Sequence, residues 1–428
     1  MEVWLVETGE TLPIGTNKGC RQRRMALLGR ALAEAGHAVT WWASTFDHYH
    51  KRHVAETEAP ITLDNGVRIR PLRGCGYSKN LSLRRLLDYI LVAFRFSRLA
   101  CEAKKPDVII CGFPSIELGF AAVKYGSKRG VPVILDVRDM WPDIFTDYVP
   151  RWIRPLFKVV LLPWFWMVGW ACGHATAITG MTEAFVDWGL IRGGRQRRET
   201  DKSFPFGYPT ETPSIKAIQE AEQYWDSLGV TTREGQKNVC YIGGLGHQLD
   251  MTGTIEASRK LKALGRPIKM VLCGSGDRLE YFRKLASDLD NMIFPGWVDA
   301  AKIHVLLRRC FAGMDPLPDR YDFLASINNK AIEYFSAGLP VISSPPRGVL
   351  SELLLTTCTG MSHECGDHAR LVDIITELCD NPEKQAEMSA NARNLFEAQF
   401  TASKVYGEMT NYLDKIGSRG TKKCLIKL

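Results

Sequence analysis

The chain has 428 residues, of which 45% are hydrophobic and 24% are charged, and its formal net charge is +8. A chain of this length exceeds the size at which one hydrophobic core keeps growing, so two domains are expected. The composition is that of a folded globular protein and excludes a disordered or fibrous one. The excess of positive charge suits an anionic partner, although a merely basic surface explains it equally well.

The cysteines and the N-terminus bear on the compartment. The 12 cysteines stand singly, without a C-x-x-C pair, which favours reduced thiols in a reducing environment. The chain opens on the strand-like run MEVWLVET without a basic leader, so no secretory signal is expected. Both observations predict a cytoplasmic protein.

Two segments, 83–105 and 156–172, combine apolar residues with a helical pattern or with aromatic residues. The uncharged run inside the second contains Pro163 and is shorter than the roughly 20 residues of a membrane-spanning helix. Both segments fit buried core helices. They fit equally well a peripheral membrane contact in which aromatic rings enter the lipid interface and Arg or Lys meets phosphate. The basic cluster RGGRQRR at 192–198 supports the second interpretation.

The first half of the chain alternates strand and helix signals. The N-terminal strand is followed by a polar loop and by RQRRMALLGRALAEAG, whose apolar residues recur every three or four positions. Further strands are expected at HAVTWWAS, DVIICG, VPVILDV and HATAITG, with a helix through ELGFAAVKYGSKRG. Strands that alternate with helices predict a parallel sheet with helical crossovers.

The segment FPFGYPTETP is rich in proline and predicts a linker between two halves. Beyond it, a second alternating series begins with NVCYIGGLG and IKMVLCGSGD and continues through NMIFPGWVD, FAGMDPL and GLPVISS. The sequence therefore predicts two α/β domains. A ligand cleft is expected between them, at the carboxyl ends of the strands.

Glycine-rich turns follow several of these strands. GSGD contains Gly274 and Gly276, and GGLG contains Gly244. Glycine lets a backbone approach a ligand closely and leaves helix N–H groups free to bind an anion. Each turn is a weak signal by itself. The long first loop, which carries Gly15 and Arg21, matches neither the dinucleotide fingerprint nor a P-loop.

The order of these pieces is more specific than any of them singly. A strand ending in Gly-x-Gly, then FPGWVD, DPLP and a helix with an acidic residue before AGLPVISS resembles the retaining glycosyltransferases of family 4. The likeness covers nearly the whole chain and includes NARNLFEAQFTASKVYGEM near its end. DVRDMWPD and NNKAIEYFSAGLPVISS look most similar to the bacterial subgroup that builds surface polysaccharides of the O-antigen or capsule type on a polyprenyl-diphosphate carrier.

The resemblance implies the GT-B fold, with two facing Rossmann-like domains and a cleft between them. Residues 1–205 would form the acceptor-binding domain, and residues 206–401 would form the nucleotide-sugar-binding domain. Segment 402–428 would carry the helix that returns to the first domain, with its tail.

The resemblance also implies a donor site. Glu333 matches the family glutamate that binds the ribose hydroxyls, and a carboxylate can accept from two adjacent hydroxyls. The family's second glutamate, near the sugar, falls on Ala325, and its diphosphate-binding Arg falls on Gly244. Because that positive charge is missing, we hypothesise that Lys330 supplies it. The alternative is that Lys330 and Glu333 form an ordinary solvated pair on the helix.

Further site residues follow from the same motifs. Asp139 is predicted to orient or deprotonate the acceptor hydroxyl, and the alternative is that it caps the next helix. Trp297 is predicted to stack on uracil, although a tryptophan buried in the core is the commoner arrangement. The other predicted donor contacts are Asn328, Asn329, Gly15, Arg21, Gly244, His247, Gly274 and Gly276.

The resulting prediction is a retaining hexosyl- or N-acetylhexosaminyltransferase that uses a nucleotide diphosphate sugar, expected to be a UDP-sugar. Its acceptor would be a lipid-linked saccharide at the cytoplasmic face of the membrane. Without a D-x-D pair or a ligand cluster, we expect no metal or other cofactor. The alternatives are a GT-B epimerase or phosphorylase, and a non-catalytic sugar-nucleotide-binding subunit. Nucleic acid is not an expected partner, because the basic residues are scattered.

Overall fold

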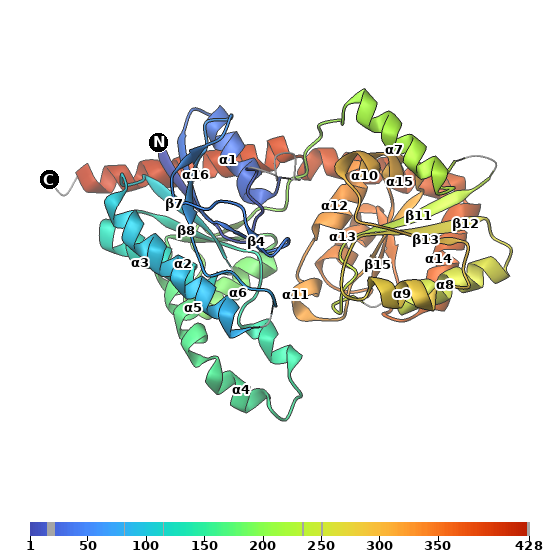
Figure 1. Ribbon diagram of the computed structural model, residues 1–428, viewed down its shortest axis with the longest axis horizontal. Coiled ribbons are helices and arrows are strands. Elements are labelled where there is room, and N and C mark those ends of the chain that lie inside the picture. The colour runs from blue at the N-terminus through green and yellow to red at the C-terminus, as the bar shows by residue number, and fades with distance from the viewer. Residues whose placement is uncertain (15–21, 81, 114, 233–234, 250, 426–428) are drawn as a thin grey trace. The chain divides into compact units, whose positions relative to one another are not determined.

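The computed structural model describes residues 1–14, 22–80, 82–113, 115–232, 235–249 and 251–425 (Figure 1). The chain divides into two compact units. Unit 1 comprises Met1–Pro205 and Ala402–Leu428, and unit 2 comprises Phe206–Thr401. Ten cysteines between Cys75 and Cys379 are free thiols.

Unit 1 is built on an eight-stranded sheet in the order β10-β9-β8-β7-β1-β2-β6-β5, in which every neighbouring pair is parallel except β5 and β6. The strands are β1 (Glu2–Val6), β2 (Ala38–Ser44), β5 (Ile61–Thr62), β6 (Arg68–Leu72), β7 (Val108–Phe113), β8 (Val133–Val137), β9 (Ala177–Gly180) and β10 (Lys202–Ser203). A separate antiparallel pair is formed by β3 (Phe46–Asp47) and β4 (Arg52–His53). The helices are α1 (Arg24–Glu34), α2 (Leu83–Glu102), α3 (Ile116–Arg129), η2 (Asp143–Tyr148), α4 (Arg154–Val160), α5 (Leu162–His174), α6 (Glu183–Gly193) and α16 (Ala402–Leu425).

Successive side chains of β1 point to opposite faces of this sheet, and each face has its own helical cover. Val3 and Leu5 belong to a core that also includes residues of α1 and α16, such as Leu28 and Leu413. Trp4, between them, packs on the other face, where its ring contacts aromatic rings of α2 and α3. The C-terminal helix therefore belongs to unit 1, and Figure 1 shows it beside α1.

Two elements of unit 1 differ from the prediction. Strand β6 was not expected, because its sequence RIRPL alternates Arg with apolar residues and contains Pro71. The apolar segment near 160 is not one helix: α4 and α5 are bent by 64°, with Pro163 in the first turn of α5. Among the described residues no single helix is long and apolar enough to cross a membrane. By length and composition alone, only this bent pair passes that test.

Unit 2 is built on a six-stranded parallel sheet in the order β13-β12-β11-β14-β15-β16. The strands are β11 (Lys237–Ile242), β12 (Ile268–Cys273), β13 (Met292–Gly296), β14 (Ala312–Pro316), β15 (Val341–Ser344) and β16 (Gly360–Ser362). The helices are α7 (Ile215–Ser227), α8 (Thr252–Ala263), α9 (Leu279–Leu285), α10 (Ala300–Arg309), α11 (Tyr321–Leu324), α12 (Asn329–Ser336), α13 (Val349–Thr357), α14 (His368–Asp380) and α15 (Pro382–Gln399).

Both sheets contain a point at which the strand order reverses. In unit 1 it lies between β1 and β7, and in unit 2 between β11 and β14. At such a point, the connections that follow the two neighbouring strands cross to opposite sides of the sheet. A crevice therefore remains at the carboxyl ends of these strands, and it is the usual ligand site of an open α/β sheet. The two switch points are therefore the places to look for functional side chains.

Candidate functional site

Glycine turns meet at the carboxyl ends of β11, β12 and β13 in unit 2. Gly274 has a φ of +144°, and a Cβ at this position would lie 1.7 Å from the carbonyl oxygen of Gly243, so only glycine fits. A Cβ at Gly276 would lie 2.3 Å from the carbonyl oxygen of Leu245. The N–H of Gly274 donates to the carbonyl of Gly296 at 2.8 Å. The backbones of the three turns are thus in direct contact.

Strand β14, across the switch point, ends beside these turns with a buried acid. Asp315 is 0% exposed, and the Nζ of Lys330 lies 3.3 Å from its Oδ1. The amide of Asn328 donates to Oδ2 of the same carboxylate. The stem of Lys330 passes the first glycine turn, because a Cβ at Gly243 would lie 3.1 Å from its Cδ. The structure therefore places the predicted cation at the switch point, next to the glycine turns.

Helix α12 positions both Lys330 and Glu333. Asn328 is its N-cap residue, and its side-chain oxygen accepts from two backbone N–H groups of the first turn at 2.9 and 3.3 Å. The predicted donor contact Asn329 is exposed. The alternative of a solvated pair is wrong, because Lys330 pairs with Asp315 and Glu333 is only 2% exposed.

The carboxylate of Glu333 is bonded within unit 2. Its Oε1 accepts from the hydroxyl of Tyr208 at 2.7 Å. Tyr208 is held in turn by its backbone N–H, which donates to the carbonyl of Phe400 at 2.8 Å. Any ligand of Glu333 would therefore share this carboxylate with Tyr208, which lies near the start of unit 2 in the sequence.

The remaining predicted contacts of unit 2 lie on the same edge of the sheet. The carbonyl of Gly244 accepts from the hydroxyl of Tyr241 at 2.8 Å. The ring of His247 is exposed and lies 3.3 Å from the equally exposed carboxylate of Asp277. Trp297 is 74% exposed, so the alternative of a core tryptophan is wrong, while stacking on a base stays a prediction.

The switch point of unit 1 holds a buried charged cluster whose ion pairs sequence reasoning missed. Nη1 of Arg138 lies 2.8 Å from Oε1 of Glu10 and 3.4 Å from Oε2 of Glu7. Its Nε donates to Oδ2 of Asp136 at 3.0 Å. Arg24 donates to both oxygens of Asp136, at 2.8 and 2.9 Å. These side chains come from β8, from α1 and from the loop that follows β1.

Burial and the neighbouring arginines together shift the pKa values of two carboxyl groups of this cluster in opposite directions. Burial alone would raise the pKa of Asp136, but the charges of Arg24 and Arg138 hold it well below its usual range. At Glu7 burial dominates and raises the pKa above its ordinary value of 4.5, although Arg138 acts against it. Glu7 needs Gly112 on the neighbouring strand, where a Cβ would lie 1.8 Å from its Oε2. Two carboxyl groups with pKa values driven apart are typical of acid–base sites.

Asp139 follows this cluster directly and is half-buried. Helix η2 begins at Asp143, and its N-cap residue is Pro142 rather than Asp139. Its role toward an acceptor hydroxyl stays a prediction. Gly15 and Arg21, predicted to face the diphosphate, lie outside the described residues.

Two further observations concern the predicted donor and metal sites. Ala325, at the position of the family's second glutamate, is buried. The described residues include no group of three or more His, Cys, Asp or Glu side chains that could hold a metal ion. Sequence reasoning missed Asp315 as well, although a single acid at the end of an apolar strand was a signal for it.

Residues 21–200 match the model of the glycosyl transferase 4-like domain, and residues 229–395 match the model of glycosyl transferases group 1. The chain belongs to the GT-B glycosyltransferases. Each matched range of this glycosyltransferase falls within one of its two units. No curated protein matches it.

Several solved structures share the fold of this glycosyltransferase and align with nearly its whole length. Sucrose-phosphate synthase from Thermosynechococcus elongatus has a TM-score of 0.69 at 16% identity, covering 98% of this chain and 99% of that chain. HepE from Anabaena in complex with UDP-glucose has a TM-score of 0.66 at 15% identity, covering 97% and 100%. WaaG, a glycosyltransferase involved in lipopolysaccharide biosynthesis, has a TM-score of 0.64 at 14% identity, covering 96% and 99%. The predicted fold class is confirmed.

Proposed function

We propose that this glycosyltransferase is a retaining hexosyl- or N-acetylhexosaminyltransferase of surface-polysaccharide biosynthesis. It moves a sugar from a UDP-sugar, held by unit 2, to a polyprenyl-diphosphate-linked saccharide, held by unit 1. The observation that carries the proposal is the position of Lys330, which Asp315 holds beside the glycine turns at the switch point of unit 2.

This arrangement suits the departing diphosphate of a nucleotide sugar. A diphosphate leaving group needs its developing charge neutralised by groups that are already in place. Lys330 supplies a positive charge, and the backbone N–H groups of a glycine turn can approach phosphate oxygens closely. HepE has been solved with UDP and with UDP-glucose, which supports UDP as the nucleotide. Retention would follow from attack on the same face of the sugar, with Asp139 orienting or deprotonating the acceptor hydroxyl.

A lipid-linked acceptor is supported by the apolar surface of unit 1. Side chains of α2, of α4 and α5, and of the turn before α4 are exposed although they are large and apolar, and such surfaces mark interaction sites. They are Leu83, Leu87, Ile90, Phe94, Trp152, Leu156, Val159, Val160, Leu162 and Trp166. We propose that this surface docks peripherally on the cytoplasmic face of the membrane, where aromatic rings enter the interface.

The test is the release of UDP from a panel of UDP-sugars by the purified full-length protein. We expect release with one sugar, strongly stimulated by membranes that carry lipid-linked saccharides and unaffected by EDTA. Turnover without any lipid acceptor would favour the epimerase or phosphorylase alternative. Binding of UDP-sugars without release under any condition would favour a non-catalytic subunit and refute the proposal.

A further inference from the structure

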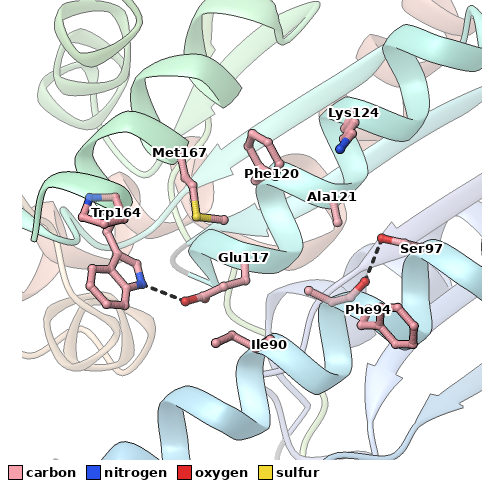
Figure 2. Close-up of a pocket in the computed structure, with 11 residues that line it drawn as sticks. Ile90, Phe94, Ser97, Glu117, Phe120, Ala121, Lys124, Trp164 and Met167 are labelled. Atoms are coloured by element: carbon pink, nitrogen blue, oxygen red, sulfur yellow. Dashed lines mark hydrogen bonds between the residues drawn. The ribbon is translucent and has the colours of Figure 1, made fainter.

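Unit 1 contains an apolar cavity of about 380 Å³ between α2, α3 and α5 (Figure 2). Its volume lies at the lower end of the range of small-molecule sites, about 300–1,000 Å³. Apolar side chains from all three helices line it: Ile90, Phe94, Phe120, Trp164 and Met167. None of its lining residues belongs to the charged cluster at the strand ends, and the reaction proposed above does not use it.

The cavity holds no exposed anionic group. Glu117 is the acidic residue in its lining, and its Oε1 accepts from the indole N–H of Trp164 at 2.8 Å. Figure 2 shows these two side chains pointing toward one another. Burial raises the pKa of Glu117 above its ordinary value. The lining is therefore apolar, with one buried acid tied to the wall.

The surroundings of the cavity select for an anionic amphiphile. Ile90 and Phe94 line it and are also 47% and 65% exposed, so the cavity is continuous with the apolar surface of α2. Lys124, also in the lining, lies 5.7 Å from the centre of the Phe120 ring and has no carboxylate partner among the described residues. A ligand that enters from this surface would contact apolar side chains, with the ammonium group of Lys124 beside them.

We propose that this cavity binds the single hydrocarbon chain of the polyprenyl-diphosphate acceptor carrier. The assignment rests on the proposed function for the identity of the acceptor. A single branched chain suits a cavity of this size, whereas a phospholipid brings two chains and a glycerol backbone. The hydrocarbon chain would anchor the acceptor on unit 1, and the diphosphate of the carrier would lie within reach of the Lys124 ammonium group.

The test uses farnesyl diphosphate and inorganic diphosphate as probes of the full-length protein, with saturating UDP present to occupy the donor site. Burial of two or three methylene groups is enough for about a tenfold difference in affinity, so farnesyl diphosphate should bind at least about tenfold more tightly. Ser97 lines the cavity and is exposed, so Ser97→Trp should fill the mouth and abolish this preference. Cys101→Trp adds the same ring to an exposed position of α2 outside the lining and should retain it.

Two results would overturn the proposal: equal affinity of the wild type and Ser97→Trp for farnesyl diphosphate, or displacement of this probe by dioleoyl phosphatidate as effectively as by unlabelled farnesyl diphosphate. Release of UDP is measured on the same preparations. If Ser97→Trp loses the preference for farnesyl diphosphate but still transfers sugar normally, the cavity does not hold the acceptor chain, and only the cavity assignment is refuted. Tight farnesyl diphosphate binding without transfer to any lipid-linked acceptor refutes the proposed function.

Discussion

Replacing Lys330 by methionine removes the charge at the proposed diphosphate site and keeps most of the aliphatic stem. The substitution also leaves a buried acid without its cation, because Asp315 is 0% exposed. Breaking a buried pair in this way typically costs about 3–5 kcal/mol. Lys330 is itself 19% exposed, and Asn328 still donates to the carboxylate, so we expect a loss of about 2–3 kcal/mol in the free energy of unfolding.

The effect on donor binding is expected to be separate from this loss. A charge-assisted hydrogen bond contributes about 1.5–3 kcal/mol, so the dissociation constant for UDP should rise about 10-fold to 100-fold in Lys330→Met. Combining it with Asp315→Asn removes the uncompensated charge. The double variant should therefore recover most of the stability while UDP binding stays weak. Lys330→Arg should keep the free energy of unfolding close to that of the wild type and the dissociation constant for UDP within a few-fold of it.

Urea unfolding measures the first quantity, and isothermal titration with UDP measures the second. If Lys330→Met loses stability but binds UDP as the wild type does, Lys330 only neutralises Asp315 and the donor-site argument is wrong. If the double variant regains UDP affinity together with stability, the loss in the single variant came from the fold. Either result would move the diphosphate site away from α12.

Three further predictions follow from single positions. Gly274→Ala should destabilise by about 3 kcal/mol or more, because the new Cβ overlaps a carbonyl oxygen, while Gly265→Ala, at φ +66° in open space, should cost only about 1 kcal/mol in the same urea series. Trp297→Ala should weaken UDP binding about threefold to tenfold in titration and leave the unfolding midpoint unchanged, since the side chain is exposed. Glu117→Gln keeps the oxygen that accepts from Trp164. Because burial raises the folded-state pKa of Glu117 above its ordinary value of 4.5, the wild type loses stability as pH rises above about 4.5. The stability of the variant relative to the wild type should therefore increase with pH above that value.

The sequence was sufficient to predict the parallel sheets and the sheet edge to which the proposed donor site is assigned. Carboxyl ends of parallel strands meet at one edge, so Gly244, Gly274 and the helix that carries Lys330 were expected to lie together. Asn328 was predicted as a donor contact, whereas the structure shows it as the N-cap residue of α12. Strand β6 was not predicted, because arginines at alternate positions and an internal proline make the apolar alternation of RIRPL difficult to recognise.

The charged partners could not be predicted, because they join residues that are distant in the chain. Arg24 meets Asp136 across more than a hundred positions, and Arg138 meets Glu10 across a similar separation. Periodicity describes which face of an element is buried, whereas these contacts depend on which two strand ends are adjacent in the sheet. Sequence reasoning therefore placed the segment DVRDMWPD, with Arg138 and Asp139, at this edge, but not the partners Arg24 and Glu10.

The two switch points share one physical device. In unit 2 the buried Asp315 holds Lys330, and in unit 1 the buried Asp136 holds Arg24 and Arg138. A buried ion pair contributes little net stability, because removing both charges from water costs about as much as their attraction returns. Such pairs are better explained by the position in which they hold a charged side chain. A cation held by a buried carboxylate is already in position when an anionic substrate arrives, so less reorganisation is needed to neutralise its charge. By this argument we propose that Arg138, whose side chain is 12% exposed, is placed to meet the proposed acceptor as Lys330 is placed to meet the proposed donor, while the buried Arg24 holds Asp136 in position.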